Sequence, residues 1–593
     1  MQQLSGAQIL IKELERLGVK HIFGYPGGAA INIFDALYDS SIELVLTRHE
    51  QGATHMADGY ARASGRLGVV LVTSGPGALN TVTGLLTAKM DSVPILVISG
   101  QTNSGNLGKD AFQEADVFGV TLPLVKHNQL ILSVQDIVPA VRRAHVLAMS
   151  GRPGPVLLDL PKDISAQKTE YAVDDSQLAR LDTKSSGVGA LRLSSLQVNA
   201  CEDMAHMIMS SKRPLILAGH GAIIAGASDA VRTLAETLGS PVTNTLLGKG
   251  AFPEEHPLAL GMLGMHGTAY ANYATTRCDL ILSIGSRFDD RINGCNDHFC
   301  PLAKKLHIDI DPAEIGRVVT PDAAVNADAK LAVEEILKHV GKLSSEEWLH
   351  ELNDYRRRHP LVSGHAGDII EGVIEEDHGE VPKDLRAAQL LECLHELAPR
   401  DSVVTTDVGQ HQMWAAQFMP TKSPRNWLSS GGAGTMGFGL PAAIGAQLAR
   451  PDATVIAVVG DGGFQMVQAE LATAAIQQLP IKIVVVDNQC LGMVRQWQEL
   501  FYQNRLSSVS LHGNPDFVAL AGAYGIKGFY VDQPALLPEV ISAALNYQDG
   551  PCLIHARVVN EDNVWPMIPA GKAAKDIVLS HPKTALPMPT GST

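Results

Sequence analysis

The stretch AVVGDGGFQMVQAEL (457–471) holds one carboxylate, Asp461, between two glycines at the end of a hydrophobic run. The run is typical of a buried parallel strand and the following residues of a helix, so Asp461 is expected at the carboxyl end of a strand, where parallel sheets bind ligands. Asn488 follows the next run, IKIVVVD, 27 residues later. One strand–helix–strand unit of that length brings both side chains to the same edge of the sheet. A carboxylate and an amide oxygen are hard donors that suit Mg²⁺, with phosphate oxygens as further ligands.

The glycine-rich segments around Asp461 and at 432–437 also allow interpretations other than a metal site. Gly-Asp-Gly alone is a common turn, and the paired Asn488 is what favours a metal. The P-loop pattern G-x-x-x-x-G-K-[ST] is absent. Gly432, Gly434 and Gly437 form a G-x-G-x-x-G that would indicate an NAD-dependent dehydrogenase. The preceding NWLSS is a weak strand, and no acidic residue ends a clear second strand about 20 residues on, so the dehydrogenase is the less favoured alternative.

Length and composition restrict the class of protein. The 593 residues predict about three or four domains at roughly 150 residues each. A net charge of -15 argues against nucleic acid or an anionic membrane surface as the main partner. The seven cysteines include no C-x-x-C pair, which favours a reducing compartment. Apolar runs stay far below the ~20 residues that span a bilayer, and the first residues are typical of an amphipathic helix rather than a signal peptide, so we expect a soluble, cytoplasmic protein.

Short β-branched runs alternate with helical patterns along three blocks of the chain. Such alternation predicts parallel sheets covered by helices on both faces. The expected fold class is α/β, with three consecutive doubly wound parallel-sheet domains. Their expected boundaries are 1–185, 193–345 and 376–565, followed by a C-terminal tail, 566–593. From about residue 570 the tail is expected to be mobile or draped over the surface. A polar stretch at 172–195 and a charged one at 342–384 are interpreted as connections.

The Gly-Asp-Gly segment with Asn488 resembles the diphosphate-binding motif of thiamine-diphosphate enzymes. The resemblance implies that Asp461, Asn488 and the main-chain carbonyl of Cys490 hold Mg²⁺ against the diphosphate of the cofactor. The family normally has Asn-Asn where this chain has Asp487-Asn488, but the ligand position is kept. The block 376–565 is thereby implied to be the diphosphate and Mg²⁺ domain.

The segment TRHEQGATHMADGYAR resembles the activating-glutamate segment of the same family and gives that role to Glu50. In these enzymes the glutamate hydrogen-bonds the aminopyrimidine ring and promotes the imino tautomer that takes the proton from thiazolium C2. Alone, Glu50 would equally suit the start of a helix, where the helix dipole favours a carboxylate. The resemblance makes 1–185 the pyrimidine-binding domain. It also implies a homodimer or tetramer, with each site formed between Glu50 of one chain and the diphosphate domain of another.

The resemblance extends to the other contacts of thiamine diphosphate. Met436 would be the bulky residue that props the cofactor into its bent conformation. The full set implied for this cofactor is Glu50, Pro76, Asn80, Val408, Gly409, Gln410, His411, Gly434, Met436, Gly460, Asp461, Gly462, Gly463, Asn488, Gly492 and Met493.

Over nearly the whole chain the sequence is most similar to the catalytic subunits of acetohydroxyacid synthases, the biosynthetic acetolactate synthases. Shared segments include YPGGA, KDAFQEAD, GMLGMHG, SRFDDR and DNQCLGMVRQWQ. SRFDDR discriminates best, because fermentative acetolactate synthases lack flavin and differ there. Pyruvate oxidases lack the pair Arg291 and Trp497. Another thiamine-diphosphate enzyme, such as a pyruvate oxidase or a fermentative acetolactate synthase, stays as the alternative.

The synthase family retains FAD although its reaction has no net redox change, so 193–345 is implied to be the FAD domain. The residues implied for FAD are Arg152, Gly219, Gly221, Leu263, Gly264, Met265, His266, Gly285, Arg287, Asp289, Arg291, Asp309, Ile310 and Asp328. The usual run of three glycines is AGHG here, which puts His220 in that turn.

The implied reaction decarboxylates pyruvate and adds its hydroxyethyl unit to a second 2-oxoacid, either pyruvate or 2-oxobutyrate. The products are 2-acetolactate and 2-aceto-2-hydroxybutyrate, on the route to branched-chain amino acids. The catalytic residues implied are Glu50, Gly28, Gln113 and Lys162, and the substrate-binding residues are Phe112, Arg291, Met265, Met493, Val494 and Trp497. A small regulatory subunit, valine feedback and the choice between dimer and tetramer are left open.

Overall fold

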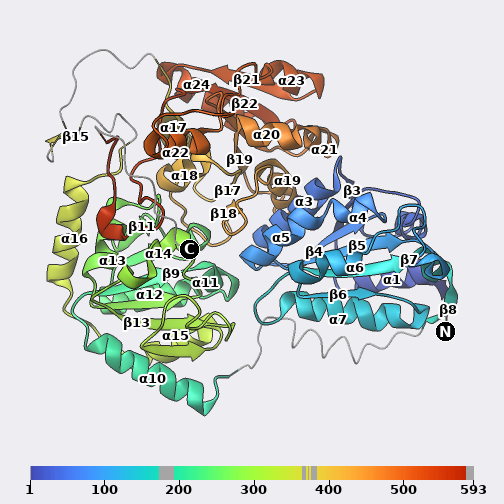
Figure 1. Cartoon of the computed structure of the whole chain (residues 1–593), viewed down its shortest axis with the longest axis horizontal. Helices are drawn as coiled ribbons and strands as arrows, with labels where there is room; N and C mark the ends of the chain where they lie inside the picture. Colours follow the sequence, from blue (N-terminus) through green and yellow to red (C-terminus); the bar gives the residue numbers. More distant parts are fainter. Residues whose placement is uncertain (1, 172–191, 363–368, 371–372, 375–383, 583–593) are drawn as a thin grey trace.

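Three six-stranded sheets carry the fold, and every strand pair inside them is parallel. The computed structural model describes residues 2–171, 192–362, 369–370, 373–374 and 384–582. Figure 1 shows the sheets as three lobes, blue, green and orange in chain order, each with helices on both faces. The expected architecture of three doubly wound α/β units is confirmed.

The N-terminal sheet has the strand order β3-β2-β4-β5-β7-β6. Its strands are β2 (His21–Gly24), β3 (Glu43–Leu46), β4 (Gly68–Val72), β5 (Ile95–Gln101), β6 (His127–Leu130) and β7 (Val156–Pro161). The helices of this lobe are α1 (Gly6–Arg16), α2 (Ile31–Tyr38), α3 (Glu50–Ser64), α4 (Pro76–Leu79), α5 (Val82–Asp91), α6 (Val117–Thr121), α7 (Ile137–Met149) and α8 (Lys162–Ala166). β1 (Gln2–Ser5) and β8 (Lys168–Tyr171) pair antiparallel beside it. Every residue of β4 and β5 is buried, because helices cover both faces.

The central sheet has the order β11-β10-β9-β12-β13-β14. Its strands are β9 (Pro214–Ala218), β10 (Val242–Asn244), β11 (Ala259–Met262), β12 (Leu280–Ile284), β13 (Lys304–Asp309) and β14 (Ala323–Asn326). The helices are α10 (Ser195–Met209), α11 (His220–Ile224), α12 (Ser228–Leu238), α13 (Ala269–Arg277), α14 (Asp290–Asn293), α15 (Ala329–Leu337) and α16 (Glu346–Arg358). A two-stranded pair, β15 (Ile369–Ile370) and β16 (Val373–Ile374), follows.

The C-terminal sheet has the order β18-β17-β19-β20-β22-β21. Its strands are β17 (Val403–Thr406), β18 (Trp427–Ser429), β19 (Val455–Gly460), β20 (Lys482–Asp487), β21 (Lys527–Val531) and β22 (Cys552–Arg557). The helices are α17 (Ala387–Leu397), α18 (Gln410–Phe418), α19 (Gly439–Ala449), α20 (Asp461–Val467), α21 (Leu471–Ile476), α22 (Gly492–Phe501), α23 (Phe517–Ala523) and α24 (Leu537–Asn546).

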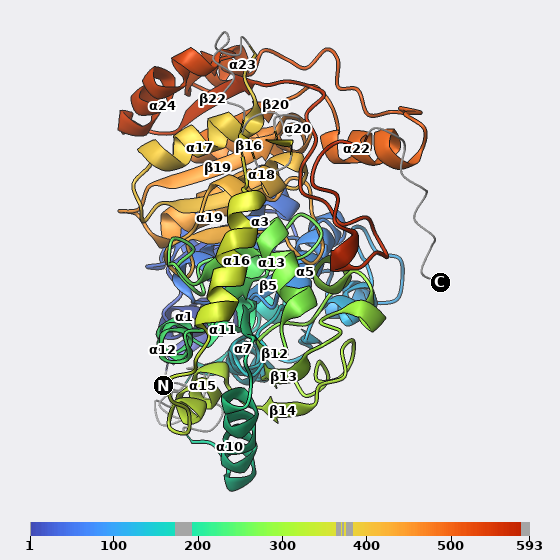
Figure 2. The same cartoon turned by 90° about the vertical axis from the view of Figure 1, so that its left-hand side faces the viewer.

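Helices α3 and α19 join the N-terminal and C-terminal lobes, and Figure 1 and Figure 2 both show them side by side. A side chain on Gly59 would collide with the backbone of Ala442, and one on Gly445 with the backbone of Met56. The glycines therefore allow the two helix backbones to approach closely. As a result one hydrophobic core extends through both lobes.

A buried polar cluster ties the same junction to the central lobe. Arg62 bonds Asp58 at 2.5 Å and Asp91 at 2.8 Å and donates to the Ser429 carbonyl. The Asp91 carboxylate also accepts from the amides of Gly431 and Gly432. These charge-assisted bonds join the N-terminal and C-terminal lobes. The central lobe reaches the same point through His220, whose Nδ1 lies 3.0 Å from the Asp91 carbonyl.

The structure makes three details of the sequence interpretation more specific. The charged segment 342–384 is not a bare connection, because α16 packs on the central sheet and Trp348 donates to the Pro214 carbonyl at 3.0 Å. As far as residue 582 the tail is held against the rest of the chain, because Val578 pairs with the buried Met567. NWLSS contains a short strand, β18, at the sheet edge, and the next helix begins only at Gly439. Residues 172–191 of the expected polar connection lie outside the described residues.

The buried Lys249 suits a stability measurement. Its ammonium lies 2.5 Å from Glu254 and donates to the Ala416 carbonyl, so it links the central and C-terminal lobes. Lys249→Ala leaves the Glu254 charge buried and unpaired, and we expect it to lower the free energy of unfolding by about 3–5 kcal/mol. The measurement is urea unfolding, with Lys249→Met combined with Glu254→Gln as the control. The control should lose much less, and equal losses would contradict a role for the charge pair.

Candidate active site

Asp461 and Asn488 lie at the ends of two neighbouring strands. Asp461 begins α20 directly after β19, and Asn488 follows β20, which pairs with β19. Both side chains are buried, with 2% and 7% of their surface exposed. The Asn488 oxygen accepts from the Cys490 amide at 3.3 Å, so the loop after β20 folds back on it. The structure therefore brings the three expected metal-binding residues to one edge of the sheet.

Asn514 joins Asp461 to the neighbouring carboxylate, Asp487. Its amide donates to Asp461 at 2.8 Å and to Asp487 at 3.0 Å. His555 and Arg557 hold the other side of Asp487. Burial and the charge of Asp487 raise the pKa of Asp461. Burial also acts against ionisation of Asp487, but its hydrogen bonds and Arg557 hold its pKa below the usual range. Asp461 is thus the carboxylate of the pair that a bound cation would stabilise most.

Glycines line the loops around this carboxylate. A side chain on Gly492 would collide with the Gln410 amide, which itself accepts from Asn488 at 3.2 Å. A side chain on Gly460 would meet the His411 ring. Such close backbone approach leaves main-chain N–H groups available to an anion such as a diphosphate.

Asp407 orients the loop that carries Met436. Its carboxylate is fully buried and accepts from the amides of Val408 and Gly437 at 2.8 Å each. Burial raises the pKa of Asp407 to about 7, although backbone hydrogen bonds oppose the rise. Because Gly437 directly follows Met436, this bond fixes the position of Met436 relative to β17.

Glu50, Asn80 and Gln113 form a second cluster on the N-terminal lobe. The Asn80 amide donates to the Glu50 carboxylate at 2.9 Å. Gly77 in α4 faces the same carboxylate. Gln113 has a φ of 57° and packs against the Gly75 turn that precedes Pro76. Gly28, Phe112 and Lys162 lie exposed on this lobe, with Phe112 88% exposed.

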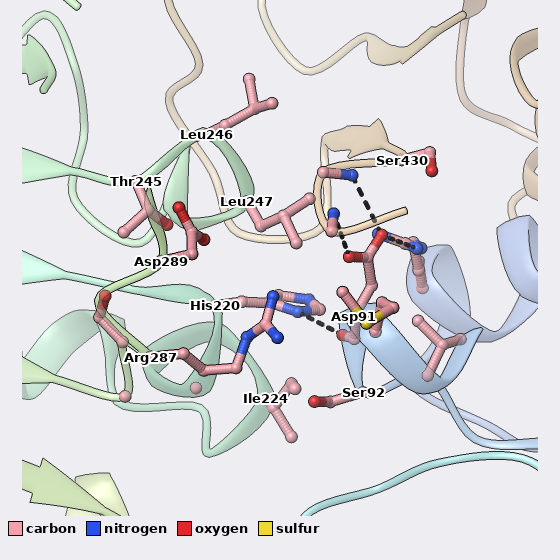
Figure 3. A pocket seen from close by; sticks show the side chains of 18 of the residues that line it. Asp91, Ser92, His220, Ile224, Thr245, Leu246, Leu247, Arg287, Asp289 and Ser430 are labelled. Carbon is pink, nitrogen blue, oxygen red and sulfur yellow. Dashed lines mark hydrogen bonds and ion pairs between the residues drawn. The ribbon is translucent and has the colours of Figure 1, made fainter. Parts of the chain in front are cut away.

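A cavity of about 1110 Å³ opens where the three lobes meet. It exceeds the ~300–1,000 Å³ of ordinary small-molecule sites and so has room for a dinucleotide. Figure 3 shows Arg287 extending into it beside His220, with Asp91 on the facing wall. Of the residues expected to hold FAD, the lining includes Arg152, Gly221, Leu263, Met265, His266, Gly285, Arg287, Asp289, Arg291, Asp309, Ile310 and Asp328. Gly219 and Gly264 lie behind that lining, packed against the backbones of Gly285 and Arg291.

The cavity offers groups of both charges. Burial raises the pKa of Asp309, at the end of β13, to about 6. Such a carboxyl suits the hydroxyls of a ribose, and the guanidinium of Arg287 suits a phosphate. The Ser286 hydroxyl is buried there without a hydrogen-bond partner among the described residues. These features fit a dinucleotide cofactor.

The same cavity extends to the C-terminal lobe. Val408, Gly409, Gly434, Met436, Met493, Val494 and Trp497 line that end. Arg291 lies 3.5 Å from the Met265 sulfur, and the Ile568 amide donates to the Met265 carbonyl at 2.8 Å. Trp497 follows Met493 by one turn of α22 and packs on Phe501. Arg291 and Trp497 therefore border one space, as their proposed shared role requires.

The N-terminal cluster does not line this cavity. Glu50, Gln113, Phe112 and Lys162 are absent from its lining, which includes both Met436 and Trp497. In the described residues of one chain, the expected catalytic residues therefore lie apart from most of the expected substrate-binding residues.

Several residues that shape the site were not expected from the sequence. Asp91, Asp407, Glu470 and Asn514 each hold a loop or carboxylate of the site through hydrogen bonds. Asp407 had a signal, since it directly follows a buried strand, as Asp461 does. Asn514 lies in an irregular loop where no pattern indicates its partner.

Comparison with known proteins identifies the class. Models for the N-terminal TPP binding, central and C-terminal TPP binding domains of thiamine pyrophosphate enzymes match residues 4–120, 201–336 and 407–556. The fold and the site thus define a thiamine pyrophosphate enzyme.

Relatives resolve the family further. The chain is 46% identical to the acetolactate synthase large subunit of Parasynechococcus marenigrum, over 99% of this chain and 93% of that protein. It is 43% identical to the acetolactate synthase of Arthrospira platensis, over 98% of both chains. It is also 43% identical to the acetolactate synthase large subunit of Pyropia yezoensis, over 97% of this chain and 95% of the relative. The chain belongs to the acetolactate synthase large-subunit family of thiamine pyrophosphate enzymes.

No helix among the described residues is both long and apolar enough to cross a bilayer.

Proposed function

We propose that this chain decarboxylates pyruvate and joins the remaining two-carbon unit to a second 2-oxoacid, pyruvate or 2-oxobutyrate. The products are 2-acetolactate and 2-aceto-2-hydroxybutyrate, precursors of branched-chain amino acids. The observation that carries the proposal is the convergence of Arg291, Met265 and Trp497 on the cavity end that also holds Met436. A guanidinium beside an apolar wall suits a carboxylate with a short alkyl tail. The names of the relatives support the same activity.

Asp461, Asn488 and the Cys490 carbonyl would hold Mg²⁺ and, through it, the diphosphate of thiamine diphosphate. When bound, this cofactor supplies a nucleophilic carbon and an electron sink for the loss of CO₂. The donors are one carboxylate, one amide and one carbonyl, a hard oxygen set that leaves positions for phosphate oxygens. Met436, held through Asp407 and Gly437, would support the cofactor in its bent conformation.

FAD would occupy the end of the cavity formed mainly by the central lobe. Asp309 at a strand end and Arg287 both line the cavity and would supply contacts that a dinucleotide needs. The arginines and aspartates of SRFDDR favour this enzyme over flavin-free acetolactate synthases, and the pair Arg291 and Trp497 favours it over pyruvate oxidases. No observation favours an NAD-dependent dehydrogenase.

Each active site would form between two chains. Glu50 and Gln113 do not line the cavity that Met436 and Trp497 line in the same chain. In a homodimer, or a tetramer of two such pairs, Glu50 would act at the diphosphate domain of the partner subunit. Gly28, Gln113 and Lys162 would complete the same site. The enzyme would work in the cytoplasm. A separate regulatory subunit is compatible with relatives that are named large subunits.

The function is tested by an acetolactate assay with pyruvate as substrate. The purified chain should turn over only with thiamine diphosphate, Mg²⁺ and FAD all present, and it should show a flavin absorption spectrum. Turnover that requires NAD instead would overturn the proposal.

Glu50→Gln keeps the side-chain shape but removes the carboxylate expected to activate the cofactor. Acetolactate formation should fall about 100-fold or more, in the range of a lost acid–base group. The fold should persist, since Asn80 can still donate to the amide oxygen. Glu43→Gln, an exposed glutamate of the same lobe, is the control and should keep full activity. A Glu50→Gln enzyme within twofold of the wild type would contradict the role.

Asp461→Ala removes the anionic ligand of the expected Mg²⁺ site. The apparent affinity for thiamine diphosphate in Mg²⁺ should fall at least about tenfold, because the diphosphate loses its neutralising cation. Flavin content should stay the same, since Asp461 does not line the cavity. Calorimetric titration measures the affinity, and Asp452→Ala in an exposed turn is the control. An unchanged affinity would exclude Asp461 as the ligand.

Trp497→Leu tests the choice of the second substrate. The extra methylene of 2-oxobutyrate is worth roughly 1–3 kcal/mol in a fitted apolar pocket, or about 10–200-fold in selectivity. We expect the variant to keep most acetolactate formation and to lose the preference for 2-oxobutyrate. The measurement is the ratio of the two products when both substrates compete.

The control for Trp497 is Phe501→Leu on the same helix. Phe501 packs against Trp497 but does not line the cavity. Its loss should reduce stability and leave the product ratio unchanged. An unaltered ratio in Trp497→Leu would mean that Trp497 serves packing alone.

A further inference from the structure

Glu470 is a buried carboxylate of the C-terminal lobe that no step above uses. It ends a short 3₁₀ turn, Gln468–Glu470, that follows the helix begun by Asp461, and only 1% of it is exposed. Its side chain crosses to the N-terminal lobe of the same chain. The two carboxylate oxygens accept from the Arg48 amide at 3.0 and 3.1 Å, and one also accepts from the His49 amide at 3.0 Å.

These two amides belong to the residues that immediately precede Glu50. Helix α3 begins at Glu50, and His49 caps it by accepting from the Gln51 amide at 3.1 Å. Gly52, two residues after Glu50, lies so close to Glu470 that a side chain there would collide with the carboxylate. Glu470 therefore fixes the backbone on both sides of Glu50.

A residue of the next helix, α21, supports this contact. Thr473 donates to Glu470 at 2.7 Å or to the Leu46 carbonyl at 3.3 Å. Burial raises the pKa of Glu470, and the hydroxyl and the two amides oppose that rise because they stabilise the charged form. The Arg48 side chain bonds the carbonyls of Leu46 and Thr47 instead, so Glu470 binds the backbone here rather than a side-chain charge.

The Glu50 side chain is held separately, by Asn80 at 2.9 Å. Asn80 can direct the carboxylate only if the start of α3 is itself fixed, because Asn80 lies outside α3, directly after α4. Active-site groups must stay within about 0.5 Å of their working geometry, which requires such support from behind.

We infer that Glu470 is a positioning residue for Glu50, and that the diphosphate domain of each chain thereby serves two active sites. The domain contributes Asp461 to the active site of its own chain. Through Glu470 it also positions the Glu50 of its own chain, and that Glu50 acts in the active site of the partner subunit. The inference rests on the proposed function, in which Glu50 acts in the site of the partner.

Hybrid dimers test this division. One chain carries Asp461→Ala and the other Glu470→Ala, and two different affinity tags select the mixed dimer. One of the two sites combines the unchanged Asp461 of the second chain with the correctly positioned Glu50 of the first chain, so this site should be active. This hybrid should show about half of the wild-type activity per dimer.

The matched hybrid pairs a wild-type chain with a chain carrying both substitutions. One of its sites then lacks Asp461 and the other has a misplaced Glu50, so neither is intact. Its activity should be about 10–100-fold below that of the first hybrid, the loss that a displacement near 1 Å can cause. Equal activities, or a more active second hybrid, would overturn the inference.

A control hybrid separates this outcome from a failure of the proposed function. Asp461→Ala paired with Glu50→Gln should also show about half of the wild-type activity if sites form between chains. If this control hybrid is inactive, the shared site is wrong. If it is active and the Glu470 hybrids do not differ, only the positioning role is wrong.

A spectroscopic measurement covers the case in which Glu470→Ala does not fold. Glu470→Gln keeps one acceptor oxygen. In this variant, NMR can follow the rate of hydrogen–deuterium exchange at C2 of the bound thiamine diphosphate. The rate should fall about tenfold with cofactor affinity within threefold of the wild type, since the exchange depends on Glu50 geometry. Glu13→Gln, which removes another fully buried carboxylate of the N-terminal lobe, should leave the rate unchanged. An unchanged rate in Glu470→Gln would overturn the inference.

Discussion

The close approach of α3 and α19 is the constraint on which the rest of the site depends. Neither Gly59 nor Gly445 leaves room for a side chain, so the two lobes meet backbone to backbone. That contact fixes where α3 begins, and hence where Glu50 lies relative to the loop after β19. Glu50 begins α3, whereas Ala61 and Arg62 near the other end of that helix line the cavity of the same chain. A helix pair held by side chains alone would sit farther apart and would leave Glu470 out of reach of the amides before Glu50.

Two buried carboxylates fix the loop that carries Met436 at the junction of the lobes. Asp91 ends α5 and binds the amides of Gly431 and Gly432, the first residues of the loop that carries Met436. Asp407 binds the far end of that loop through Gly437. The loop is thus anchored at both ends by carboxylates from two lobes, and each carboxylate is buried. Removal of either would leave main-chain N–H groups without acceptors, so the loop depends on the junction of the lobes as much as on its own sequence.

The sequence was sufficient to predict the parallel sheets and the approximate place of the proposed metal site. Strands such as β4 and β19 are apolar along their whole length, and Asp461 and Asn488 stand where such strands end. It was not sufficient for contacts between lobes. Glu470 has the spacing of an ordinary helical residue, and nothing in the chain marks Arg48 and His49 as its partners, more than 400 residues away. The segment before the tail shows the same limit, because nothing in its sequence indicates that the Ile568 amide donates to the Met265 carbonyl.

His220 shows how a departure from a family pattern can leave a turn intact. Three glycines are usual there, and an imidazole in the middle position would threaten a tight turn. Only Gly219 and Gly221 must lack a side chain in this turn, because their α-carbons face the Gly285 turn. His220 instead begins α11 and points across the cavity, where its Nδ1 lies 3.0 Å from the Asp91 carbonyl. Burial lowers its pKa to about 4, so the ring is neutral, and one nitrogen can donate to that carbonyl. The substitution therefore adds a contact between the central and N-terminal lobes, at the carbonyl of the residue whose carboxylate already binds Arg62 and the glycine-rich loop.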